Sequence, residues 1–306
     1  VNIVEALSPD DAYDLVLVIM RKNHALKVLP VLAENHHTPN VLFLMNNAAG
    51  PSALVKALGR ERVLIGFPNS AGYREGHVVH FISGTDREKA YIPFGEVDGI
   101  TTERTWRVAE TLESAPGFGA QIRTDMDTWL RYHVALLMPS MAPALYAAGT
   151  DRLRLVRTRD LQVLMLRAIR EGFNVLLSLG LPVTPHRLAY VRWVPEPIAI
   201  QFLRRILSNE LMEVAAVRHA EAARDEMKHL ADEFLAVART TSVDTPAIDQ
   251  LYPYFDPGTP LMPDGSSEIP LKWGGTVALA GGVVVTVAAM VAGSMLVRHT
   301  LTRKEG

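Results

Sequence analysis

The sequence contains no cysteine among its 306 residues, which excludes disulfide bonds and thiolate metal sites. It also lacks a marked charge imbalance: the 31 Lys and Arg residues face 33 Asp and Glu residues. The resulting net charge of −2 gives no reason to expect nucleic acid as a partner. Val1–Ala6 has neither the basic start nor the apolar core of a secretory signal, so we expect none here.

A glycine-rich phosphate loop is missing as well. The pattern Gly-x-Gly-x-x-Gly, which holds a dinucleotide pyrophosphate at a helix N-terminus, occurs nowhere in the chain. The nearest string, Gly117–Gly119, has no third glycine and precedes a predicted strand instead of a helix. The pair His36–His37 has no partners at metal-ligand spacing, so no metal site is predicted.

Two apolar runs that end abruptly in polar residues are the main features present. Asp14–Arg21 and Val41–Met45 are rich in branched residues, which is typical of strands buried on both faces of a parallel sheet. A short helix is predicted between them. Open α/β sheets bind ligands at the carboxyl ends of their strands. The predicted ligand site there consists of Met20, Arg21, Asn46 and Asn47.

Each of these polar pairs has a simpler interpretation. Arg21 and Lys22 would meet a cofactor phosphate, or else be solvated loop cations. Asn46 and Asn47 would bind a nicotinamide ribose or the substrate, or else form a turn, which asparagine favours. The residues alone leave both alternatives open.

The pattern along the chain predicts an α/β fold with an incomplete Rossmann-like parallel sheet, then an all-α domain and a C-terminal transmembrane helix. Strand and glycine patterns extend to residue 123, and long helical patterns follow, with Pro139 and Pro143 expected to split the first of them. Four prolines in Asp256–Pro270 indicate a linker. The predicted units are residues 1–123, 124–255, 256–270 and 271–298.

The last unit contains a long uncharged segment. Gly274–Val297 has no charged residue over 24 positions, which is long enough to span a bilayer, although a buried apolar helix has the same pattern. The basic residues after it, beginning with Arg298, would place the C-terminus in the cytoplasm. A folded domain without a signal favours cytoplasmic main domains instead. We expect a single-pass membrane protein with its main domains in the cytoplasm.

The order of these features resembles ketopantoate reductase (2-dehydropantoate 2-reductase). The resemblance covers roughly residues 1 to 255. The matching stretches are Asp14–Arg21, Met45–Gly50, Glu61–Gly66, Gly76–His80, Ile92–Gly99, Asp125–Arg131 and Thr245–Tyr252. The resemblance implies NADPH-dependent reduction of a 2-keto acid or related carbonyl, and a homo-oligomer is compatible with it. It also implies that the first β-α-β unit of the family, with its glycine loop, precedes the start of this sequence.

The resemblance assigns roles to individual positions. The family's catalytic lysine falls at Arg131, which can hold a carboxylate but does not release its proton at working pH. In a chain with the glycine loop restored, a lysine placed there is therefore expected to recover part of the activity. The Asn of the later strand matches Asn47, whereas two family asparagines fall at Ala135 and Pro139. The family's Ser, Asp and Glu of the last helix align with Asn209, Glu213 and Glu221, with Glu226 as a competitor for the last of these.

These positions define the predicted chemistry. Arg131 and Glu221 would be catalytic, and Asn47, Asn209 and Glu213 would bind substrate. Arg131 has an alternative as a surface cation paired with Asp127 one helical turn earlier. A second hypothesis for the whole chain is a non-catalytic, membrane-tethered family member that binds a metabolite or a partner.

Overall fold

The computed structural model describes residues 3–82, 84–85 and 88–273. Two strands at the centre of a sheet region are buried along their whole length, as their apolar sequences predict: β2 (Val41–Leu44) and β3 (Val63–Gly66). Their side chains alternate between two apolar layers. One layer is covered by α1 (Lys22–Ala25), η1 (Leu26–Val28), α2 (Leu29–Glu34) and α3 (Ser52–Leu58), and the other by α4 (Glu103–Glu113).

The main sheet has five strands in the order β1-β2-β3-β6-β7. The three strands besides β2 and β3 are β1 (Val16–Val18), β6 (Ala90–Glu96) and β7 (Phe118–Ile122). The prediction of a parallel sheet is wrong for one pair, because β6 runs antiparallel to β3 while the other pairs are parallel. The chain reaches β6 through the hairpin of β4 (Ala71–Glu75) and β5 (Val78–Ile82), without the crossover helix that parallel pairing needs.

The first strand differs from its prediction. It spans three residues, whereas the apolar run was predicted to be a strand buried on both faces. Leu17 and Ile19 are 41% and 59% exposed. The reason is position: β1 is at one end of the strand order and α4 packs on the far strands, so one face of β1 has no helix over it among the described residues.

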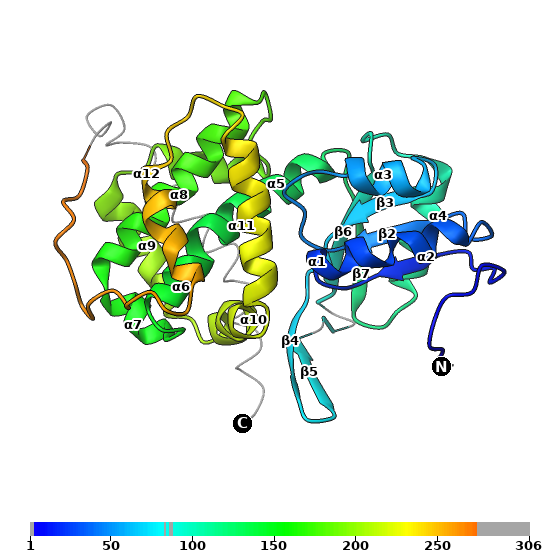
Figure 1. Ribbon diagram of the computed structural model, residues 1–306, viewed down its shortest axis with the longest axis horizontal. Helices are drawn as coiled ribbons and strands as arrows, with labels where there is room; N and C mark the ends of the chain where they lie inside the picture. The colour runs from blue at the N-terminus through cyan, green and yellow to red at the C-terminus, as the bar shows by residue number, and fades with distance from the viewer. Residues whose placement is uncertain (1–2, 83, 86–87, 274–306) are drawn as a thin grey trace.

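The helical region lies beside the sheet region (Figure 1). Its first segment is split as the prolines predict, because a five-residue π-helical turn, η2 (Leu137–Met141), separates α5 (Met126–Leu136) from α6 (Ala142–Ala147). Six further helices of this region are, in chain order, α7 (Arg152–Arg157), α8 (Arg159–Ser178), η3 (His186–Arg192), α9 (Glu196–Leu207), α12 (Pro246–Leu251) and η5 (Tyr252–Phe255).

One of the long helical patterns of the sequence, over residues 210–238, does not form a single helix. It consists of a π-helical segment, η4 (Glu213–Arg218), then α10 (His219–Ala222) and α11 (Arg224–Ala238). Ala223, with φ −130° and ψ 34°, ends one helix and starts the next. This break changes which residues of the segment face the sheet region.

The segment predicted to be a linker, residues 256–270, is instead held along the helical region. Asp160 accepts the amide hydrogens of Glu268 and Ile269 at 2.8 and 2.9 Å, and Met262 donates to the Ala147 carbonyl at 3.0 Å. The predicted transmembrane stretch, Gly274–Val297, lies outside the described residues. Within residues 3–273, the described helices include none long and apolar enough to cross a bilayer.

Candidate functional site

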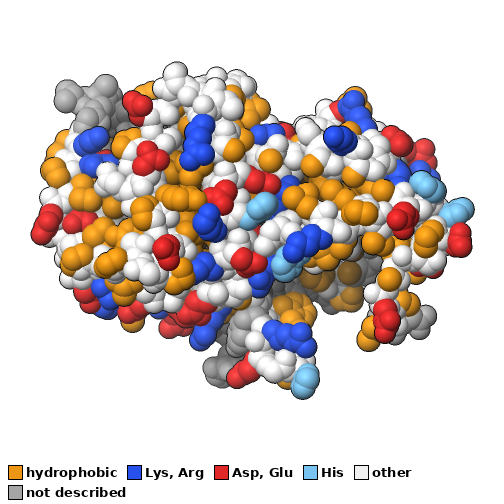
Figure 2. Space-filling model, viewed as in Figure 1, with side chains coloured by type: hydrophobic (Ala, Val, Ile, Leu, Met, Phe, Trp, Pro, Cys, Tyr) orange, Lys and Arg blue, Asp and Glu red, His pale blue; other side chains and the backbone are white. Residues whose placement is uncertain are grey.

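The carboxyl end of β1 meets α10 and α11 of the helical region. Arg21 donates to the Ala222 carbonyl and pairs with Asp225 at 2.9 Å. The backbone amide of Lys22 donates to Glu226 Oε1 at 3.0 Å. Figure 2 shows Lys, Arg, His, Asp and Glu side chains gathered along this boundary. The boundary is therefore polar where the predicted ligand site lies.

Lys22 lies at the centre of this boundary and is 1% exposed. Its Nζ donates to Asn47 Oδ1 at 2.8 Å and lies 4.0 Å from Glu233 Oε1. Burial lowers the pKa of the Lys22 ammonium and Arg131 lowers it further, whereas Glu233 and Asp127 raise it. The net effect of burial and these charges is a lowered pKa, so the Lys22 ammonium releases its proton more readily than an ammonium in water.

Asn47 joins this lysine to the loop after β2. Its Oδ1 also accepts the Gly50 amide at 3.1 Å, so the amide group has one orientation. The opposite atom, Nδ2, is buried without a hydrogen-bond partner. The same holds for Asn46 Oδ1, Asp127 Oδ1 and Glu233 Oε2. Buried polar atoms of this kind normally have a partner, so the cluster is suited to a polar ligand.

Arg131 is committed to other contacts. Its guanidinium donates to Asp127 Oδ2 at 3.1 Å, to the Ala48 carbonyl at 3.1 Å and to the Ala49 carbonyl at 3.4 Å. The partner expected from helical spacing, Asp127, is confirmed, but the arginine also holds the loop that follows Asn47. It therefore lies close to the site with three of its five N–H donors already in use.

Of the other predicted site residues, one lies at the boundary and three lie away from it. Met20 lies at the end of β1 and is 39% exposed. Three residues from the last predicted helix are bonded elsewhere, and none contacts Lys22, Asn47 or Arg131 through a hydrogen bond or ion pair in the described part of the chain. Asn209 accepts the Leu211 amide, Glu213 pairs with Arg152 at 3.6 Å, and Glu221 accepts from Thr150 at 3.0 Å. Glu226, the competitor, is the glutamate that reaches the boundary.

Two acidic side chains reach this boundary from α11: Glu226, which the sequence offered as a competitor of Glu221, and Glu233, to which it assigned no role. Glu226 and Glu233 are seven residues apart on α11, which places them on one face of a helix. That spacing was the available signal. It became useful only with the helix break at Ala223, because a continuous helix would direct other glutamates to the same place.

His133 is removed from acid–base chemistry by its surroundings. Its ring stacks on Trp129 with centroids 5.1 Å apart and lies 4.4 Å from the Phe67 ring. Burial, with a smaller effect of His219, lowers the pKa of His133 to about 4. The imidazole is therefore neutral near pH 7.

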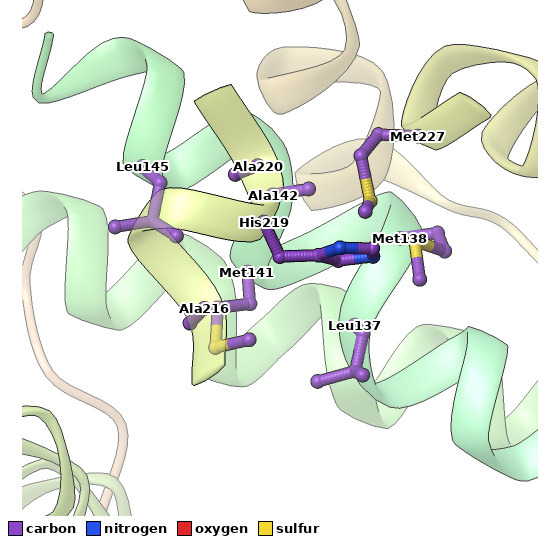
Figure 3. Close-up of a pocket in the computed structure, with 9 residues that line it drawn as sticks. All are labelled: Leu137, Met138, Met141, Ala142, Leu145, Ala216, His219, Ala220 and Met227. Atoms are coloured by element: carbon purple, nitrogen blue, oxygen red, sulfur yellow. The ribbon is translucent and has the colours of Figure 1, made fainter. Parts of the chain in front are cut away.

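His219 borders a small apolar cavity of about 30 Å³ (Figure 3). Its ring points toward Met138 and Met227, and burial together with Arg21 lowers the pKa of His219. The other lining residues are Leu137, Met141, Ala142, Leu145, Ala216 and Ala220. A neutral imidazole among apolar side chains is a weak proton donor, so this histidine does not replace the missing lysine.

Comparison with known proteins shows the fold. No protein-family model and no curated protein matches the sequence. A 2-dehydropantoate 2-reductase from Geobacter metallireducens GS-15 has 20% identity and a TM-score of 0.62, over 81% of this chain and 78% of that one. A D-mandelate dehydrogenase solved with NADH and anilino(oxo)acetate has 13% identity and a TM-score of 0.61, over 81% and 76%.

This chain has the ketopantoate reductase fold. A putative ketopantoate reductase from Ralstonia solanacearum MolK2 is similar in the same way, at 17% identity and a TM-score of 0.62 over 80% of this chain and 76% of that one. At these identities the likeness shows the fold alone, so the chemistry must be argued from the residues of this chain.

The boundary residues of this ketopantoate reductase fold match one half of a nicotinamide dinucleotide. The unpartnered Asn46 Oδ1 and Asn47 Nδ2 offer an acceptor and a donor of the kind that a carboxamide or ribose hydroxyl requires. The pyrophosphate half has no glycine loop in this sequence. The residues present therefore fit the nicotinamide end and leave the phosphate end without its usual backbone donors.

Proposed function

We propose that the chain is an oxidoreductase that reduces a 2-keto acid or a related carbonyl with a nicotinamide cofactor, at the boundary between the sheet and helical regions. The observation that carries this proposal is the buried Lys22–Asn47 pair at the carboxyl end of parallel strands, with further polar atoms left unpartnered around it. When bound, the cofactor would supply a hydride to the carbonyl carbon. The chain's own residues would bind the carbonyl oxygen and stabilise the charge that develops there.

Individual residues have distinct parts in this proposal. Asn47 Nδ2 would donate to the carbonyl oxygen, and Asn46 would contact the nicotinamide end of the cofactor. Arg21 is the cation available for the additional phosphate of NADPH, although in this structure it is paired with Asp225. The preference for NADPH over NADH and the substrate roles of Asn209 and Glu213 rest on the family resemblance.

The alternative is a non-catalytic protein that binds a metabolite at the same boundary. It is favoured by Arg131, Ala135 and Pro139, which stand where the resemblance places a catalytic lysine and two amides. The two hypotheses differ in whether a bound keto acid is turned over.

Reduced nicotinamide mononucleotide should distinguish them. This compound lacks the pyrophosphate and the adenosine, so it does not need a glycine loop. We expect the chain to bind NADPH more weakly than micromolar, as measured by calorimetry, and to oxidise the mononucleotide when 2-dehydropantoate or phenylglyoxylate is added. Ligand binding without any oxidation of either donor would favour the non-catalytic alternative, and micromolar NADPH binding would show that the loop is not needed.

We use the name strap for residues 256–272, which lie along the helical region. We also propose that the segment after the strap anchors the protein in a membrane, with the main domains in the cytoplasm. Gly274–Val297 is the stretch of the sequence suited to this. Removing residues 274–306 should transfer the protein from the membrane fraction to the supernatant, while the strap contacts of residues 256–272 remain. Retention of the shortened chain in sodium carbonate-washed membranes would contradict the proposal.

A further inference from the structure

Reduction of a ketone also requires a proton on the developing alkoxide, and most titratable groups near the boundary are unsuited to donating it. A guanidinium does not release its proton at working pH, so Arg131 is no proton donor, and three of its N–H groups are bonded to protein oxygens. His133 is neutral and stacked between aromatic rings. Glu226 accepts a backbone amide, and burial raises the pKa of its carboxyl, with the Lys22 amide opposing this.

Lys22 has the geometry that these groups lack. An ammonium has three N–H donors, and one of them, toward Asn47, has a hydrogen-bond partner among the described residues. Glu233, at 4.0 Å, is close enough to act on the charge but too far for a hydrogen bond. The ammonium is therefore fixed at one donor and free at the others, and Asn47 Nδ2 is a second free donor beside it.

We propose that Lys22 is the proton donor of the reduction, with Asn47 as a second hydrogen-bond donor to the carbonyl oxygen and Glu233 as a positioning residue. This inference rests on the proposed function. The carbonyl oxygen of a 2-keto acid would accept hydrogen bonds from Lys22 Nζ and Asn47 Nδ2. As a reduced nicotinamide supplies the hydride, the Nζ–H bond breaks and an O–H bond forms, which leaves a 2-hydroxy acid and a neutral amine.

The neutral amine must regain a proton from water, and the structure provides a connection to the surface. Glu233 Oε1 lies 3.4 Å from His229 Nε2, and the His229 side chain is 35% exposed. His229, Glu233 and Lys22 thus lie in a row from the solvent to the buried amine, and water must bridge the 4.0 Å step from Glu233 to Lys22 because that step is too long for a hydrogen bond. The charged or titratable groups that face Lys22 from its own segment, α5 and α11 are Arg21, Asp127, Arg131, Glu226, His229 and Glu233.

The test compares Lys22→Met with Lys27→Met in the full chain. Methionine has a similar length and no charge, and circular dichroism checks that Lys22→Met is folded, because the substitution leaves Glu233 without this cation. Lys27 is exposed in η1 and is a matched control. We expect Lys22→Met to lower the rate of keto acid reduction with reduced nicotinamide mononucleotide by about 100-fold or more, the scale of one lost acid–base group. Lys27→Met should leave the rate unchanged.

Two further measurements separate a proton donor from a structural lysine. The ¹⁵N-detected titration of the Lys22 ammonium should place its pKa below the ordinary value of a lysine. Glu233→Gln should lower the pKa of Lys22, because the carboxylate stabilises the charged form. Reduction needs the protonated amine, so the pH at which the rate falls should move downward in Glu233→Gln. A purely structural lysine would change the rate without moving this pH.

The outcomes are distinct. Full activity in Lys22→Met, or a Lys22 ammonium that titrates at the ordinary value of a lysine, would overturn the assignment and leave the proposed function in place. If the unaltered chain reduces no keto acid with the mononucleotide, NADH or NADPH, the proposed function fails, and the assignment fails with it. Chemical rescue of Lys22→Ala by methylammonium would support a direct role for the amine.

Discussion

Replacing Glu196 with alanine should lower the free energy of unfolding by about 3–5 kcal/mol, the range for breaking a buried ion pair from one side. Glu196 is 1% exposed and accepts two hydrogen bonds from Arg167, both at 2.8 Å. It also accepts the Lys272 amide at 2.7 Å and lies 3.8 Å from Arg170. Its loss leaves two partly buried guanidinium groups without their anion and releases the end of the strap.

The pH dependence of this loss follows from the pKa of Glu196. Burial alone would raise this pKa, but the bonds from Arg167 and Lys272 hold it below its ordinary value. A carboxyl with a lowered pKa in the folded state stabilises the fold above its unfolded pKa, and this stabilisation is lost as the pH falls through the folded value. The difference between the two proteins should thus be complete at pH 7 and shrink below about pH 4.

Denaturant titration followed by tryptophan fluorescence would measure the difference. Glu210→Ala is the matched control, because Glu210 is an exposed glutamate shortly after the same helix. Its replacement should change the free energy of unfolding by less than about 0.5 kcal/mol. Equal effects of the two substitutions at pH 7 would show that the buried cluster does not stabilise the protein. The same cluster anchors Lys272, two positions before the apolar segment, so Glu196→Ala should also make the backbone of Leu271–Trp273 more susceptible to proteases.

The central strands could be predicted from the sequence because their burial is a local property. An unbroken apolar run such as Val41–Leu44 is buried wherever a sheet has helices on both faces. The run at β1 has the same composition, yet Leu17 is exposed. What differs is whether another element covers it, and a strand's own residues do not carry that information.

Only the part of the site that depends on local sequence could be predicted. The strand ends at Arg21 and Asn47 indicated where polar groups gather, because the carboxyl ends of parallel strands share one edge. The burial of Lys22 depends on α11, which is about two hundred positions away in the chain, and could not be derived from local pattern. The choice between Glu221 and Glu226 depended on the break at Ala223, which a gap-free alignment assumes to be absent.

Arg131→Lys should fail to increase activity, in contrast to the expectation from the family alignment. That expectation treated residue 131 as the proton donor, whereas the structure shows a clamp on the loop that carries Asn47. Its guanidinium holds the Ala48 and Ala49 carbonyls together with Asp127. A lysine has no planar fork and cannot make all of these bonds. We expect a loss of about 1–3 kcal/mol in the free energy of unfolding, the scale of one charge-assisted hydrogen bond.

Gly50 tests the same clamp from the other side. Gly50 has φ +84°, which disfavours other residues, and a Cβ there would overlap the Arg131 guanidinium. Gly50→Ala should therefore reduce stability and weaken the binding of oxamate, a non-reactive keto acid analogue, because both Arg131 and Asn47 lose their positions. If Arg131 instead binds the substrate carboxylate, Arg131→Lys will weaken oxamate binding in calorimetry while the free energy of unfolding stays unchanged. Loss of stability in both variants, with Lys22 still needed for reduction, is the result that the clamp requires.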